Sequence, residues 1–157
     1  MANICDNDFT YYGDNQRELL KFYLIFQQAY EEGNGDAKTI LSLLGATPEM
    51  IDGIDGRTSV NFVELLMSSE TITGVRFMAE SAWAPCEDFA KFALLAAIPG
   101  GGDIELCYVA EEPGCEVFIN TLAAQYLRLL GHKISSNGSV SNTFILELPS
   151  PSIISVP

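Results

Sequence analysis

Residues 72–98 read ITGVRFMAESAWAPCEDFAKFALLAAI and join a strand pattern directly to a helix pattern. The first part has the period of two that is typical of a half-buried strand: Val75, Phe77 and Ala79 alternate with Arg76, Met78 and Glu80. In the second part, apolar residues recur at the spacing of an amphipathic helix: Phe89, Phe92, Ala93, Leu95, Ala96 and Ile98. The stretch predicts a strand at 72–82 and a helix that Pro85 opens and Pro-Gly-Gly-Gly at 99–102 ends.

The preceding residues predict a strand, a long helix and a small helical insertion. Residues 4–12 are rich in aromatic side chains and are closed by Gly13, which suits a strand. We expect Asp14 to cap the following helix and Gly-Asn-Gly at 33–35 to end it. Residues 36–52 predict two short helices. The first has Asp36 as its cap and ends at Gly45, and its apolar face consists of Ile40, Leu41, Leu43 and Leu44. The second begins at Thr47-Pro48.

The order of these elements predicts an α+β fold. Residues 60–66 form a further strand pattern, and Ile104, Leu106 and Tyr108 alternate before a turn at 111–114. The order contains β-α-β-β-α-β, so we expect a ferredoxin-like antiparallel sheet with helices on one face. We expect one domain at 1–148, with 36–52 as a helical insertion and extra C-terminal elements, a helix at 121–131 and a strand at 143–148. An apolar C-terminal tail follows at 149–157.

Composition and charge exclude several classes of protein. The chain has 157 residues, of which 48% are hydrophobic and 18% charged, so it is too apolar to be disordered. It carries 21 acids against 8 bases, a net charge of −13, which argues against binding a nucleic-acid backbone or an anionic membrane. Residues 117–157 hold one acid, Glu147, against Arg128 and Lys133, so the acidic surplus belongs to residues 1–116.

The sequence also indicates a reducing compartment. The N-terminus has neither the basic nor the apolar region of a signal peptide, and no stretch approaches the ~18 apolar residues of a membrane span. The cysteines lack a Cys-x-x-Cys pair, which favours reduced, buried thiols over a zinc site that includes His132: they are Cys5, Cys86, Cys107 and Cys115. We therefore expect a cytoplasmic protein without cofactor or metal.

Acidic residues and one tryptophan are the candidate site residues. Paired carboxylates at Glu80, Glu111 and Glu112 could perform acid–base work or bind a hard cation, although hairpin tips commonly carry solvated acids. Trp83 is either a partner anchor or a packing residue at a strand–helix corner, and the second reading is favoured. The residues that we assign to partner binding are Trp83, Glu80, Glu87, Asp88, Glu111 and Glu112.

Other patterns give no catalytic site. No Gly-x-Ser-x-Gly elbow accompanies His132, so a serine-hydrolase site is not indicated. The glycines at 100–102 follow a helix pattern and precede a strand pattern, the reverse of a phosphate-binding loop. We therefore expect no enzyme of either kind.

Two segments resemble a known family. The start, Met-Ala-Asn-Ile-Cys-Asp-Asn at 1–7, is similar to the "Met-x-Asn-Trp-Cys-x-Asn" opening of the YubB-type ferredoxin-like domain family. Residues 80–86, Glu-Ser-Ala-Trp-Ala-Pro-Cys, and Glu-Glu-Pro-Gly at 111–114 resemble its "Trp-Ser-Pro-Pro … Glu-x-x-Glu-Pro-Gly" pattern, and Asp-Gly-Arg at 55–57 is similar to a loop in relatives from gut bacteria. The resemblance implies a ferredoxin-like fold without an iron–sulfur cluster, in proteins often encoded by plasmids, phages and other mobile elements. It supplies no catalytic residues.

These observations lead to one principal hypothesis and several alternatives. The principal hypothesis is a non-enzymatic acidic protein that binds a protein partner with a basic surface. A sharper form is an anti-defence inhibitor, anti-CRISPR or anti-restriction, that mimics nucleic-acid charge in a nuclease channel. The alternatives are an accessory protein whose charge only aids solubility, a small-ligand or metal-dependent enzyme using Glu80, Glu111 and Glu112, and self-association through the sheet edge or the tail.

Overall fold

The computed structural model describes residues 4–54, 57–82, 84–112 and 117–119. Strands and helices follow one another in the order that the sequence predicts, with most boundaries within two residues of the expected ones. The elements are β1 (Ile4–Tyr12), α1 (Gln16–Glu32), α2 (Ala37–Leu44), α3 (Pro48–Asp52), β2 (Thr58–Ser68), β3 (Thr71–Ala82), α4 (Glu87–Ala97), β4 (Glu105–Glu111) and β5 (Val117–Ile119).

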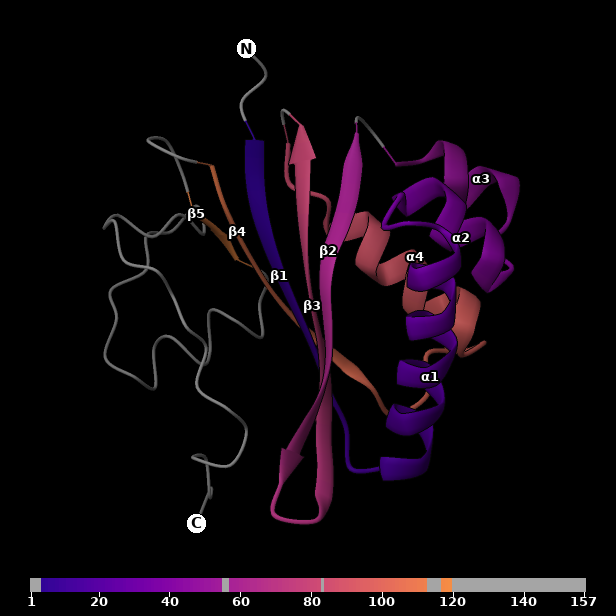
Figure 1. The fold of residues 1–157 in the computed structure, drawn as a ribbon, viewed down its shortest axis with the longest axis vertical. Coiled ribbons are helices and arrows are strands. Elements are labelled where there is room, and N and C mark those ends of the chain that lie inside the picture. The colour runs from indigo at the N-terminus through magenta and orange to yellow at the C-terminus, as the bar shows by residue number, and fades with distance from the viewer. Residues whose placement is uncertain (1–3, 55–56, 83, 113–116, 120–157) are drawn as a thin grey trace.

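The strands form one antiparallel sheet in the order β2-β3-β1-β4-β5, and the described helices cover one of its faces (Figure 1). Strand β1 lies in the middle and pairs with both β3 and β4. The α+β class is thereby confirmed, and the arrangement is compatible with a ferredoxin-like kind of fold. We call the face turned away from the helices the outer face.

Local capping explains where α1 begins and ends. The prediction that Asp14 caps this helix is wrong, because the side chain of Asn15 accepts the hydrogen bond from the amide of Glu18. After the helix, the left-handed conformation occurs at Asn34 and Gly35, with φ angles of 48° and 79°. A Cβ at Gly35 would collide with the Val60 carbonyl oxygen, so this turn needs glycine to approach β2.

The helical insertion is confirmed in outline. Asp36 caps α2, Gly45 ends it in the left-handed conformation with φ 85°, and Thr47 caps α3. The prediction that Leu43 in α2 and Leu95 in α4 belong to the apolar faces of their helices is wrong, because they are 47% and 42% exposed. In each helix the buried stripe runs through other positions, Ile40, Leu41 and Leu44 in α2 and Ala90, Ala93, Leu94 and Ala97 in α4, and the exposed leucine lies beside that stripe. Helix α4 begins at Glu87 rather than at Pro85.

An aromatic cluster fills the space between the helices and the sheet. The ring of Phe77, on β3, lies 4.7 Å from that of Phe9 and 4.5 Å from that of Phe26, centroid to centroid. Tyr11 and Phe89 lie within 5.7 Å of the same ring, and all five side chains are fully buried. Phe77 therefore connects two strands and two helices in the core.

Several predicted features lie outside the described residues. They include the helix at 121–131, the strand at 143–148, the tail at 149–157, and the side chains of Trp83, Cys115 and His132. Among the helices that are described, none is both long and apolar enough to cross a membrane.

Removal of the Phe77 ring tests the aromatic core. We expect Phe77→Ala to lower the free energy of unfolding by about 3–5 kcal/mol, since it leaves a cavity where four other rings meet. Leu43→Ala, at a 47% exposed position, is expected to change it by less than about 0.5 kcal/mol. Urea unfolding measures both; equal effects would contradict the proposed core.

Candidate partner-binding surface

A buried asparagine holds the centre of the sheet together. Asn7, on β1, is only 1% exposed. Its amide nitrogen lies 2.8 Å from the Cys5 carbonyl oxygen, 3.2 Å from that of Ala79 and 2.9 Å from the Ser81 hydroxyl. Its carbonyl oxygen accepts hydrogen bonds from the Tyr108 hydroxyl, at 2.8 Å, and from the Cys86 amide, at 3.1 Å. The side chain is satisfied on both its donor and its acceptor atoms.

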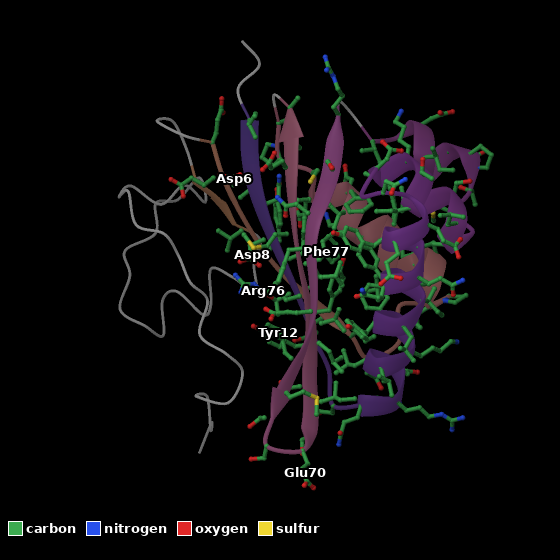
Figure 2. All side chains as sticks on the ribbon, viewed as in Figure 1. Asp6, Asp8, Tyr12, Glu70, Arg76 and Phe77 are labelled. Atoms are coloured by element: carbon green, nitrogen blue, oxygen red, sulfur yellow. The ribbon has the colours of Figure 1, made fainter. Side chains whose placement is uncertain are left out.

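These bonds join β1 to both neighbouring strands and to the start of α4. Cys86 is the N-cap residue of α4, and its own side chain makes no capping bond. Asn7 therefore accepts a hydrogen bond at a helix end that would otherwise present unsatisfied amides. Because Asn7 points toward the helices, its neighbours Asp6 and Asp8 must point toward the outer face. Figure 2 shows Phe77 on the helix side of the sheet and Asp6, Asp8 and Arg76 on the other.

Three carboxylates lie side by side on the three central strands, near one end of the sheet. In the strand register, Asp6 on β1 is directly opposite Glu80 on β3 and directly opposite Glu111 on β4. Asp6 and Glu80 are exposed, and Glu111 is half-buried. Side chains opposite each other in antiparallel strands have Cβ atoms about 4.5–5.5 Å apart. We call Asp6, Glu80 and Glu111 the acidic row.

Few cations compensate the acidic row. Within the described part of the chain, Asp6, Glu80 and Glu111 have no lysine or arginine at ion-pairing distance. The Asn61 amide donates a weak hydrogen bond of 3.4 Å to Glu80. The row therefore keeps three negative charges close together, with no described lysine or arginine at ion-pairing distance.

The rest of the outer face is also acidic. Alternation in β1 to β4 puts every charged residue of these strands on this face: Asp6, Asp8, Glu64, Arg76, Glu80, Glu105 and Glu111. The single cation, Arg76, is already occupied, since its guanidinium binds both carboxylate oxygens of Asp8 and lies 3.4 Å from Glu64. These contacts raise the pKa of Arg76. The outer face of these four strands thus carries a strong negative surplus.

The other predicted site residues lie elsewhere. Glu87 and Asp88 are in the first turn of α4, where Lys91 pairs with them at 3.3 Å and 3.8 Å. Their charge is matched by this lysine and by the positive end of the helix. Glu112 follows β4 and is half-buried; its charge contributes to raising the pKa of Cys5. Trp83 lies outside the described residues.

The structure brings together only part of the carboxylate set Glu80, Glu111 and Glu112. Glu80 and Glu111 are brought near each other, on either side of Asp6. However, a cavity that Glu80 lines at this end of the sheet includes neither Glu111 nor Glu112 among its described lining residues. No group of three or more histidine, cysteine or carboxylate side chains is arranged to hold a metal ion within the described residues.

Asp6 and Asp8 are the site residues that sequence reasoning missed. The alternation of residues 4–9, Ile-Cys-Asp-Asn-Asp-Phe, carried the signal. If Phe9 faces the core, Asn7 must also face it, and Asp6 and Asp8 must face outward. That reading required a buried asparagine, which polarity alone does not suggest.

The described cysteines are free and buried thiols: Cys5, Cys86 and Cys107. Burial is the main cause of their altered acidity and raises the pKa of Cys5 to about 11 and those of Cys86 and Cys107 to about 12. Nearby carboxylates, Glu112 at Cys5 and Asp8 at Cys107, act in the same direction. Such thiols are protonated and poorly nucleophilic at neutral pH.

Comparison with protein-family models, with curated proteins and with solved structures finds no significant match to this chain.

The raised thiol pKa values predict a loss of stability in alkali. Each thiol has an ordinary pKa of 9.0 and a folded-state pKa near 11 or 12. The unfolded chain therefore loses these protons first, and stability that is complete below about pH 9 falls as the pH rises toward about 12. Burial of Tyr11 and Tyr108 raises their pKa values and acts in the same direction.

Urea unfolding with a reductant at about pH 8 and about pH 10.5 measures this loss. Each thiol that stays protonated in the folded chain but ionises in the unfolded chain lowers the free energy of unfolding by up to about 1.4 kcal/mol per pH unit. Cys86→Ala is expected to flatten the dependence by one such contribution. A free energy of unfolding that is the same at both pH values would show that the thiols are not buried.

Proposed function

We propose that this protein is a non-enzymatic binding protein whose acidic row docks a basic surface of a protein partner. The observation that carries the proposal is the register that aligns Asp6, Glu80 and Glu111 on three neighbouring strands without a described cation beside them. Like charges directly opposite each other destabilise a sheet. The acidic row therefore lowers the stability of the unbound protein, and a bound cationic surface would relieve the repulsion between its carboxylates.

The chemistry of such an interface follows from the charge. A field of one sign attracts a partner of the opposite sign and raises its rate of association, and added salt weakens this effect. The net charge of −13 extends that field beyond the row. The partner is therefore expected to present clustered arginine and lysine residues.

The sharper form of the proposal is an anti-defence inhibitor that mimics nucleic-acid charge. Neighbouring strands lie about 4.8 Å apart, so the acidic row spaces three negative charges over about 10 Å. DNA likewise presents closely spaced negative charges to the lysines and arginines that bind it. The resemblance of residues 1–7 and 80–86 to a family encoded on mobile elements supports this form, in which the row occupies the DNA or guide-RNA channel of a nuclease.

Affinity capture with charge-matched variants tests the proposal. The immobilised chain is incubated with nuclease-treated bacterial lysate, and proteins are eluted between about 0.1 and 0.5 M salt, where screening of surface charge becomes strong. We expect basic proteins that wild type retains to be lost by the variant Asp6→Asn, Glu80→Gln, Glu111→Gln.

The control variant removes the same charge elsewhere. Glu31→Gln, Glu32→Gln and Glu70→Gln replace three exposed glutamates on α1 and at the β2–β3 turn. This control is expected to retain the basic proteins. If both variants lose the same proteins, total charge rather than the acidic row is responsible, and the charge serves general solubility.

A further inference from the structure

A cavity of about 440 Å³ opens where β1 begins, β3 ends and β2 begins. Its volume lies within the range of about 300–1,000 Å³ that is typical of small-molecule sites. The lining combines two carboxylates, one guanidinium, hydroxyl and amide groups and a small apolar wall: Ile4, Asn34, Asp36, Arg57, Thr58, Ser59, Glu80, Ser81 and Ala82.

One buried hydroxyl in this lining lacks an adequate partner. Thr58 is 6% exposed, and its hydroxyl makes no hydrogen bond to an oxygen or nitrogen atom of the described residues. The weakly hydrogen-bonding thiol of Cys86 lies beside it. The hydroxyl oxygen itself exposes less than 1 Å², so Thr58 forms part of the cavity wall and its hydroxyl is out of reach of a ligand.

The charges around the cavity are separated rather than paired. Arg57 lines the same cavity as Asp36 and Glu80, yet among the described ion pairs none involves Arg57. One oxygen of Asp36 accepts two hydrogen bonds from Thr39, and one oxygen of Glu80 accepts the bond from Asn61. The second oxygen of each carboxylate makes no hydrogen bond to the described residues.

We propose that this cavity binds a small zwitterion of the α-amino-acid class. The ligand carboxylate binds the Arg57 guanidinium, which has the planar donor geometry for it. The ligand ammonium lies between Glu80 and Asp36, which line the cavity together. Ile4 and Ala82 provide the apolar wall for the ligand side chain.

The floor of the cavity is rigid. Ser81 lines it and is fixed by Asn7, which donates to its hydroxyl, and by the Ala84 carbonyl oxygen, to which that hydroxyl donates at 2.6 Å. A lining that is held in place before binding loses little conformational freedom when the ligand enters.

Thermal unfolding of the full chain with each proteinogenic L-amino acid, at about 10 mM, tests the proposal. We expect at least one amino acid to raise the midpoint by several degrees. Its carboxamide and its deaminated acid, each lacking one of the two charges, are expected to cause no rise. No rise with any amino acid, or an equal rise with the singly charged analogues, would overturn the proposal.

Calorimetric titration of that amino acid into variants locates the site. Arg57→Ala and Glu80→Gln are each expected to weaken binding at least about tenfold, because each removes a charge-assisted contact. Arg17→Ala, which removes an exposed arginine on α1, is the matched control and is expected to bind as wild type. Unchanged affinity in Arg57→Ala would exclude this cavity.

Glu80 belongs both to this cavity and to the acidic row, so a variant outside the cavity separates the two proposals. Asp6→Asn with Glu111→Gln is expected to keep the amino-acid affinity while losing the basic partner. If this variant lost amino-acid binding as well as partner binding, the amino acid would have to bind outside the cavity.

Discussion

The hydrogen bonds of Asn7 are the interaction on which the arrangement of the sheet depends. They connect β1 with β3, β4 and the first amide of α4 through one buried carboxamide. A shift of one residue in β1 would turn Asp6 or Asp8 toward the aromatic core and Phe9 toward the outer face. Burying an unpaired carboxylate is far more costly than burying a satisfied amide, so the bonds of Asn7 and the ring of Phe9 favour the same register.

That register separates the two faces of the sheet chemically. The helix side holds the aromatic cluster around Phe77, and the outer face holds every charged residue of β1 to β4. Packing energy on one face thereby supports an unfavourable concentration of like charge on the other. Arg76 reduces the repulsion near Asp8 and Glu64 but leaves the acidic row unmatched among the described residues.

Local patterns predicted the elements well, while contacts between distant residues could not be predicted. The alternation around Val75 to Ala79, the cap at Asp36 and the stop at Gly45 depend on neighbours in sequence, and each is confirmed. Glu80 and Glu111 were expected near each other if their strands paired, but β1 lies between β3 and β4, so Asp6 separates the two carboxylates. Asp6 was missed because its position depends on the burial of Asn7, whose partners other than Cys5 are more than 70 residues away. The cavity beside Thr58 likewise requires four separate segments to meet, at 4, 34–36, 57–59 and 80–82.

A double-mutant cycle between Asp6 and Glu111 tests most directly that the register creates a repulsive acidic row. The free energy of unfolding is measured at low salt for wild type, Asp6→Asn, Glu111→Gln and the double variant. If the carboxylates repel each other, the double variant is less stable than the sum of the single effects predicts, by about 0.2–1 kcal/mol, and high salt reduces this difference. Strict additivity at low salt would mean that the two charges are not neighbours and would contradict the account.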